Sequence, residues 1–255
     1  MKKLLSKISL VFFFFGVDLM RIYSFRFFIR FLRDRSRFKK LGGKISHIMP
    51  EFGDFSEAAG KAKGHYFHQD LFVSSLIRKE SPKRHIDIGS RIDGFVAHVA
   101  SFREIEVLDI RKLEQSVHKN IVFQQQDITK EDEKLVSCTD SLSCLHALEH
   151  FGLGRYGDNV DPQGHIKGYK NLVKMLKDEG LLYISFPIAA VSVVCFNTHR
   201  IFEPSEVLTW SDEMSLKLFA FVDDCGDLHT SADVGKLPKL DYGCGIYVLK
   251  KIKGC

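Results

Sequence analysis

The sequence predicts an α/β fold with a mostly parallel seven-stranded sheet, helices on both faces and antiparallel last strands. From residue 83 onward, short apolar segments bounded by turn residues alternate with amphipathic segments, which is typical of βα units. The expected strands cover residues 84–90, 104–110, 120–128, 140–148, 181–188, 215–224 and 242–251. The expected helices cover residues 65–80, 95–102, 166–180 and 202–210, with Gly180 and Ser205 as caps.

The charge distribution separates the first 40 residues from the rest. They hold eleven Lys and Arg against Asp18 and Asp34, a net charge of +9, so the remaining residues carry 5 − 9 = −4. The sequence therefore predicts a basic, aromatic, helical arm over residues 1–45 and one domain over residues 46–255. Because this arm is strongly positive, we expect it to bind an anionic partner.

Within the arm, arginines alternate with aromatic residues between residues 21 and 33. This pattern indicates a helix that lies in an anionic membrane surface. The alternatives are a helix that packs on the rest of the protein, and a signal sequence or membrane anchor. The apolar stretch from Ile8 to Val17 is ten residues, whereas a spanning helix needs about 20. The sequence contains no motif of a known nucleic-acid-binding domain, so we expect no nucleic acid as partner. Its six cysteines are scattered without a CxxC pair, which favours free, reduced thiols over disulfides. We expect a cytoplasmic protein, peripheral at the membrane if the arm binds lipid.

A glycine turn and two strand-end acids form a nucleotide-like pattern. Gly89 and Gly94 bracket Arg91, which replaces the middle glycine of the dinucleotide pattern GxGxxG. A pyrophosphate needs bare backbone there, whereas S-adenosylmethionine carries no phosphate. Asp109 ends the next strand, where it could accept hydrogen bonds from a ribose, and Asp127 ends the third. The candidate cofactor-binding residues are Asp87, Gly89, Ser90, Gly94, Asp109, Asp127, Ile128 and His146.

The segment after the fourth strand carries the candidate catalytic groups. His146, Glu149 and His150 spell HxxEH, which also matches an inverted zinc-protease motif. Because His146 is expected in a loop rather than on a helix, we expect no metal there. His150 is the expected general base, with Glu149 beside it. The alternative is that His146 and His150 only form hydrogen bonds with the backbone of the loop. The candidate substrate-binding residues are Arg155, Tyr156, Asp158, His165 and His199.

Three segments resemble a known family: HIDIGSRIDGF (85–95), LHALEHFGLGRYGD (145–158) and FNTHRIF (196–202). The family is catalogued as a domain of unknown function, with members in bacteria, often beside surface-polysaccharide genes, and in nematodes. The resemblance implies a Rossmann-like class I methyltransferase fold and S-adenosylmethionine as cofactor. Arg91 and Asp93 depart from the class I pattern, which usually has glycines at these positions.

Three functions follow as expectations. The first is S-adenosylmethionine-dependent O-methylation of a small-molecule acceptor, a sugar or glycan precursor. The second is a methyltransferase-like binding or scaffold protein that has lost catalysis, motivated by Arg91, Asp93 and the basic arm. The third is a zinc hydrolase.

Overall fold

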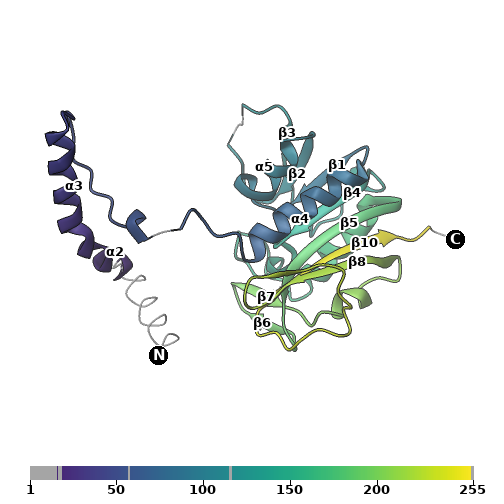
Figure 1. Ribbon diagram of the computed structural model, residues 1–255. Helices are drawn as coiled ribbons and strands as arrows, with labels where there is room; N and C mark the ends of the chain where they lie inside the picture. The colour runs from purple at the N-terminus through teal and green to yellow at the C-terminus, as the bar shows by residue number, and fades with distance from the viewer. Residues whose placement is uncertain (1–15, 17–18, 57, 115–116, 254–255) are drawn as a thin grey trace. The chain divides into compact units, whose positions relative to one another are not determined.

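The computed structural model describes residues 16, 19–56, 58–114 and 117–253. The chain forms two compact units, Met1–Lys61 and Ala62–Cys255 (Figure 1). Residues 46–61, which were expected in the body, thus belong to the first unit. No helix among the described residues is long and apolar enough to cross a membrane. The apolar stretch from Ile8 to Val17 lies outside the described residues, apart from Gly16.

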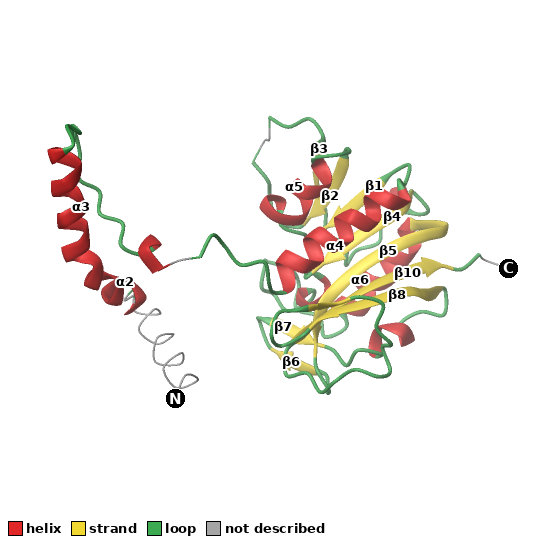
Figure 2. Cartoon of the chain, in the orientation of Figure 1, coloured by secondary structure: helices red, strands yellow, loops and turns green. Residues whose placement is uncertain are grey.

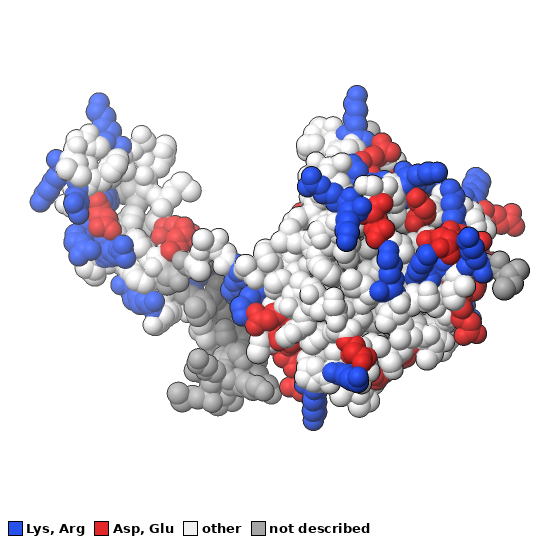
Figure 3. Space-filling model, turned by 45° about the vertical axis from the view of Figure 1, so that its right-hand side comes forward, with Lys and Arg blue, Asp and Glu red and all other residues white. Residues whose placement is uncertain are grey.

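The first unit is helical, as expected for the arm. It contains α2 (Leu19–Ser24), η1 (Phe25–Phe27), α3 (Phe28–Lys40) and the short turn η2 (Asp54–Ser56). The ring of Phe52 packs edge-on against three phenylalanines of the helical segment, Phe25, Phe28 and Phe31. Basic side chains predominate over acidic ones on the face of this unit that Figure 3 shows.

The second unit is built on one sheet (Figure 2). Its strand order is β3-β2-β1-β4-β5-β10-β8-β9. The first five strands in this order run parallel, and β10 is antiparallel to both β5 and β8. The strands are β1 (His85–Ile88), β2 (Ile105–Asp109), β3 (Ile121–Gln125), β4 (Thr139–Leu145), β5 (Leu176–Ile188), β8 (Met214–Val222), β9 (Leu228–His229) and β10 (Gly243–Lys251). All seven expected strands are present, and the two-residue β9 makes an eighth.

Helices cover both faces of this sheet, which confirms the predicted layers. α4 (His65–Glu80), the π-turn η3 (Ile92–Val96) and α5 (Ala97–Ala100) bury one apolar cluster with the sheet. α6 (Gly164–Met175) buries a second cluster, which includes Trp210. Burying the apolar faces of these elements is the main stabilising term of the fold.

The end of one predicted helix is wrong, and a second predicted helix is not formed. α6 stops at Met175 because Leu176 already pairs with Thr139 of β4, so Gly180 lies inside β5 instead of capping a helix. The segment expected as a helix over residues 202–210 forms only the turn η6 (Glu206–Thr209). Its expected cap, Ser205, donates its hydroxyl to Glu203.

Smaller elements connect the strands. A two-stranded ribbon, β6 (Val193–Cys195) and β7 (His199–Ile201), was not predicted. The turns η4 (Glu133–Leu135) and η5 (Leu148–His150) follow β3 and β4 in the chain.

Candidate functional site

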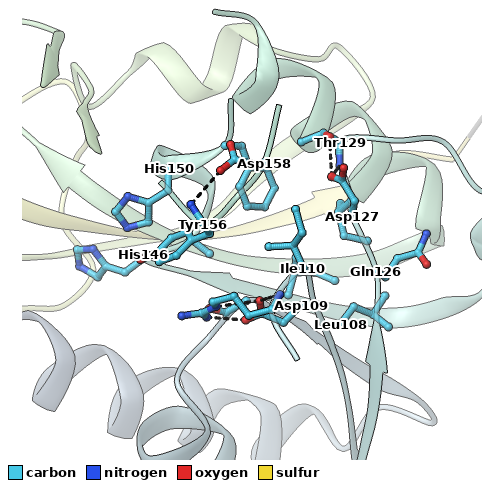
Figure 4. Close-up of a pocket in the computed structure, with 16 residues that line it drawn as sticks. Leu108, Asp109, Ile110, Gln126, Asp127, Thr129, His146, His150, Tyr156 and Asp158 are labelled. Atoms are coloured by element: carbon cyan, nitrogen blue, oxygen red, sulfur yellow. Dashed lines mark hydrogen bonds and ion pairs between the residues drawn. The ribbon is translucent and has the colours of Figure 1, made fainter. Parts of the chain in front are cut away.

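A cavity lies at the carboxyl ends of β1, β2 and β4, where ligands bind in parallel α/β sheets (Figure 4). It contains about 550 Å³ of empty space, part of it open to solvent. Figure 4 shows His146 and His150 at one end of this first cavity and Gln126, Asp127 and Thr129 at the other. Leu108, Ile110 and Ile128 supply apolar walls between these polar ends.

The turn after β1 brings bare backbone to this cavity. Gly89 has φ +71°, and its N–H donates to the carbonyl of Leu108 at 2.9 Å. A Cβ at this position would lie 3.0 Å from that of Ala147. The sequence therefore needs glycine here both for the positive φ and for the close approach of the neighbouring loop.

Asp87 lies beneath that turn and is fully buried. Its carboxylate accepts from the N–H and hydroxyl of Ser90, at 3.0 and 2.7 Å, and from the hydroxyl of Ser143 at 2.5 Å. Burial raises the pKa of Asp87 to about 7, against the opposing effect of these hydrogen bonds. Asp87 and Ser90 thus hold the shape of the turn. Gly94, the other predicted turn glycine, lies against the carboxylate of Asp70.

Asp109 ends β2 and lines the first cavity, as predicted from its spacing. Its two oxygens face the guanidinium of Arg111, with Nε–Oδ1 2.9 Å and Nη2–Oδ2 2.5 Å. The Asp109 side chain is 11% exposed and that of Arg111 is 44% exposed. Arg111 thus occupies one acceptor position on each oxygen of the Asp109 carboxylate, where a ribose would compete with it.

Asp127 follows β3 by two residues and lies at the far end of the same cavity. One oxygen accepts from the N–H and hydroxyl of Thr129, at 3.1 and 2.6 Å. The other lies 3.3 Å from the amine of Lys130. Ile128, beside Asp127, forms part of the apolar wall.

A second cavity adjoins the first, and the two share five lining residues: Gly89, Arg111, His146, His150 and Tyr156. It is larger and more polar, with about 1330 Å³ of empty space that includes open solvent. Four histidines and two carboxylates line it: His65, His146, His150, His199, Asp70 and Glu149.

His150 has a geometry suited to proton transfer. Its Nδ1 donates to the carbonyl of Thr198 at 2.7 Å, which leaves the lone pair on Nε2. Burial lowers the pKa of His150 from its ordinary value, although Glu149 acts in the opposite direction. A neutral imidazole with a free Nε2 can accept a proton at neutral pH.

His146 leaves β4 with φ +49° and lies in the loop, as expected. Its Nδ1 is 2.9 Å from Oε1 of Glu149, whose side chain is 1% exposed. Nε2 of His146 and Oε2 of Glu149 are both buried and have no hydrogen-bond partner among the described residues. The zinc-protease helix is not formed, because residues 148–150 make a single 3-10 turn and His146 precedes it.

The predicted substrate-binding residues divide into two groups. Arg155, Tyr156 and His199 line the second cavity, and Arg155 donates to the carbonyl of Thr198 at 2.9 Å. Asp158 touches the first cavity, but its carboxylate accepts from three backbone N–H groups of its own loop, those of Gly152, Gly154 and Tyr156. Asp158, expected as a substrate-binding group, therefore shapes the loop.

The assignment of His165 to the substrate site is wrong. It lies in α6, is 8% exposed and packs against the rings of Phe202 and Trp210, at 5.6 and 5.8 Å. Burial and the nearby Arg200 lower the pKa of His165 to about 4. The residue is a neutral member of the apolar core.

Several residues of the second cavity were not predicted. His65, Tyr66, Gln69 and Asp70 come from the first turns of α4, and Tyr242 precedes β10. The rings of His65 and Tyr242 are 5.4 Å apart. His65, His146 and Cys244 also form the one group among the described residues whose ligand atoms are close enough to hold a metal ion.

Comparison with known proteins supports the fold. Residues 95–209 match the model of a family described as "Caenorhabditis protein of unknown function, DUF268", in line with the resemblance expected from the sequence. No curated protein matches this chain. Three solved structures are similar over 72–74% of this chain and 79–89% of theirs.

The first of these structures is the N-methyltransferase NodS from Bradyrhizobium japonicum, in complex with S-adenosylhomocysteine (13% identity, TM-score 0.50). The second is 1,6-didemethyltoxoflavin-N1-methyltransferase from Burkholderia thailandensis (12%, 0.51), and the third is the cyclase SpnF (11%, 0.53). The chain has the Rossmann-like class I methyltransferase fold, as predicted.

Proposed function

We propose that this chain is an S-adenosylmethionine-dependent methyltransferase that acts on a small polyhydroxylated acceptor, such as a sugar or glycan precursor. The observation that carries the proposal is the pair of adjoining cavities, one suited to a nucleoside and the other lined by a candidate base. NodS and the toxoflavin enzyme, which share the fold, were both solved with S-adenosylhomocysteine.

The residues of the first cavity fit an adenosyl group. The apolar side chains of Leu108 and Ile128 offer a surface for the flat base. Asp109 can accept from both ribose hydroxyls once Arg111 moves aside. Gly89 presents backbone where any side chain would meet the next loop.

Bound S-adenosylmethionine supplies an electrophilic methyl group on its sulfonium. The chain's own contribution is to orient the acceptor and to accept its proton. In the second cavity, Nε2 of His150 takes a proton from the acceptor hydroxyl, while the carbonyl of Thr198 fixes the tautomer. Arg155, Tyr156 and His199 face the same space and can bind the remaining hydroxyls.

Calorimetric titration with S-adenosylhomocysteine tests the cofactor. The wild-type chain should bind one equivalent, and Asp109→Ala should bind it at least about tenfold more weakly, because unpaired buried hydroxyls cost about 1–3 kcal/mol. Asp93→Ala is the matched control, because Asp93 is 72% exposed and pairs with Arg91. A wild-type chain that binds no S-adenosylhomocysteine would contradict the proposal.

A second candidate function is a catalytically inactive binding or scaffold protein with the same fold. The ion pair between Asp109 and Arg111 favours it, because the ribose-binding carboxylate already has a partner. The cyclase SpnF shows that proteins of this fold are not all methyltransferases. Incubating the chain with labelled S-adenosylmethionine and a panel of sugars and nucleotide sugars separates the two: transfer of label supports the enzyme.

We propose that the first, helical unit binds an anionic lipid surface. Ile22, Tyr23, Phe25 and Ile29 are each at least 59% exposed, beside basic side chains of the same helical segment. The guanidinium of Arg26 lies 3.6 Å from the centre of the Tyr23 ring. Exposed rings with adjacent cations are typical of helices that lie in a membrane interface.

A further inference from the structure

Three metal-ligating side chains from distant parts of the sequence meet beside the second cavity. His65 begins α4, His146 follows β4, and Cys244 lies in β10. One ligand atom of each lies within 4.8 Å of those of the other two. The ring centres of His65 and His146 are 5.5 Å apart.

The orientation of His146 leaves one buried ring nitrogen without a hydrogen-bond partner among the described residues. Nδ1 of the ring lies against Glu149, which leaves Nε2 as the nitrogen available to a ligand. This nitrogen is buried, on a side chain that is only 5% exposed, and has no partner among the described residues. An unsatisfied buried polar atom destabilises the folded chain in the absence of a ligand. A carboxylate that holds the far nitrogen of a histidine is the usual outer partner of a metal-bound imidazole.

The thiol of Cys244 is equally poorly satisfied. It is fully buried, and its two polar contacts are long, 3.7 Å to the carbonyl of Gly245 and 4.0 Å to Oε1 of Gln69. With the carboxylate of Glu149 nearby, a thiolate at Cys244 would balance the two positive charges of a divalent ion. A neutral cluster of this kind avoids the cost of burying a net charge.

We propose that His65, His146 and Cys244 bind a zinc ion, with a fourth position open toward the second cavity. Two imidazole nitrogens and one thiolate suit zinc and exclude calcium and magnesium, which prefer oxygen ligands. Zinc bonds of about 2.0–2.3 Å require ligand atoms roughly 3.5 Å apart, so the side chains must close by about 1 Å. Three protein ligands with an open position are the arrangement of catalytic rather than structural zinc.

The open position would take the oxygen of a water molecule or of the acceptor, and this last step rests on the proposed function. A zinc-bound hydroxyl loses its proton more readily than a free one, and His150 is placed to receive that proton. The metal site itself does not depend on methyl transfer.

Calorimetric titration of the chelator-treated full chain with zinc chloride tests the site. We expect one equivalent to bind to the wild-type chain, and Cys244→Ser to weaken the affinity at least about a hundredfold, because each ligand supplies several kcal/mol. His65→Gln should weaken it similarly, and Glu149→Gln about 10–100-fold through the orientation of His146. Cys138→Ser is the control, a free thiol of the same domain that lies outside the cluster.

Cobalt substitution gives a second readout. Cobalt bound to the wild-type chain and to Cys138→Ser should show sulfur-to-metal charge-transfer absorption, and Cys244→Ser should lack it. If Cys244→Ser does not fold by circular dichroism, the zinc affinity of His65→Gln is compared with that of the wild type instead, because this variant keeps the thiolate and replaces a side chain at the start of a helix. Absent zinc binding, or equal affinity in the wild type and the ligand variants, overturns the proposal.

Titration of the same samples with S-adenosylhomocysteine separates this inference from the proposed function. Zinc binding without S-adenosylhomocysteine binding would overturn only the methyltransferase assignment. S-adenosylhomocysteine binding without zinc binding would overturn only the metal site.

Discussion

The ion pair between Arg111 and Asp109 predicts opposite effects for the loss of its two members. Arg111 engages both oxygens of the carboxylate that a ribose would use. An ion pair with one member 44% exposed is worth about 0–1 kcal/mol. Arg111→Ala removes that cost of displacement, so S-adenosylhomocysteine should bind up to about fivefold more tightly. Asp109→Ala should weaken binding about tenfold or more.

A double-mutant cycle by calorimetry checks this reasoning. In the Asp109→Ala background, Arg111→Ala should no longer tighten binding, because the effect acts through Asp109. Lys236→Ala is the control, since Lys236 also pairs with an exposed aspartate, Asp233, and neither lines the two cavities. Weaker binding by Arg111→Ala in the wild-type background would refute the displacement, and would mean that Arg111 contacts the ligand itself.

Three further predictions concern stability and the membrane. Burial raises the pKa of Asp87 from 3.8 to about 7, so the folded state holds its proton more tightly than the unfolded state. The free energy of unfolding should therefore fall by about 4 kcal/mol as the pH rises from 4 to 7, and Asp87→Asn should remove most of this slope in urea titrations at several pH values. Gly152→Ala would drive a Cβ into the backbone oxygen of Asp161 and should lower the free energy of unfolding by about 2 kcal/mol or more. Gly157→Ala, at a residue with a similar φ but open space around it, should lower it by about 1 kcal/mol. Equal melting temperatures of the two variants would contradict this. Replacing Arg30 and Arg33 together by alanine should weaken binding of the full chain to phosphatidylserine vesicles about thirtyfold, at about 1 kcal/mol per charge, and wild-type binding that ignores lipid charge would argue against a membrane role.

The strands and their layers were predictable because local patterns determine them. Buried runs such as residues 181–188 contain few polar residues, and each is bounded by turn residues. The end of α6 was not predictable, because Leu176 is recruited by pairing with Thr139, a long-range interaction. A helical pattern alone continues to Gly180, which explains the error.

The site was most directly predictable where one strand end determines it. Asp109 and Asp127 were found because the carboxyl ends of parallel strands share one edge of the sheet. His65 and Cys244 were missed, since no local motif relates residues 179 positions apart in the sequence. His165 was misassigned because a histidine in a polar stretch gives no sign that its helix turns it into the core.

The position of β10 has a consequence for how the protein is made. It is the last strand in the sequence, yet it lies between β5 and β8 in the sheet. Until residues 243–251 have been synthesised, β8 and β9 have no partner that joins them to the first five strands, and apolar strand edges remain open to other chains. The same strand carries Cys244 and, in Lys251, an amine that donates to the carbonyls of Val173 and Leu176 at the end of α6. A chain interrupted before residue 243 would therefore lack both a complete sheet and one of the three proposed zinc ligands, and is expected to aggregate during synthesis.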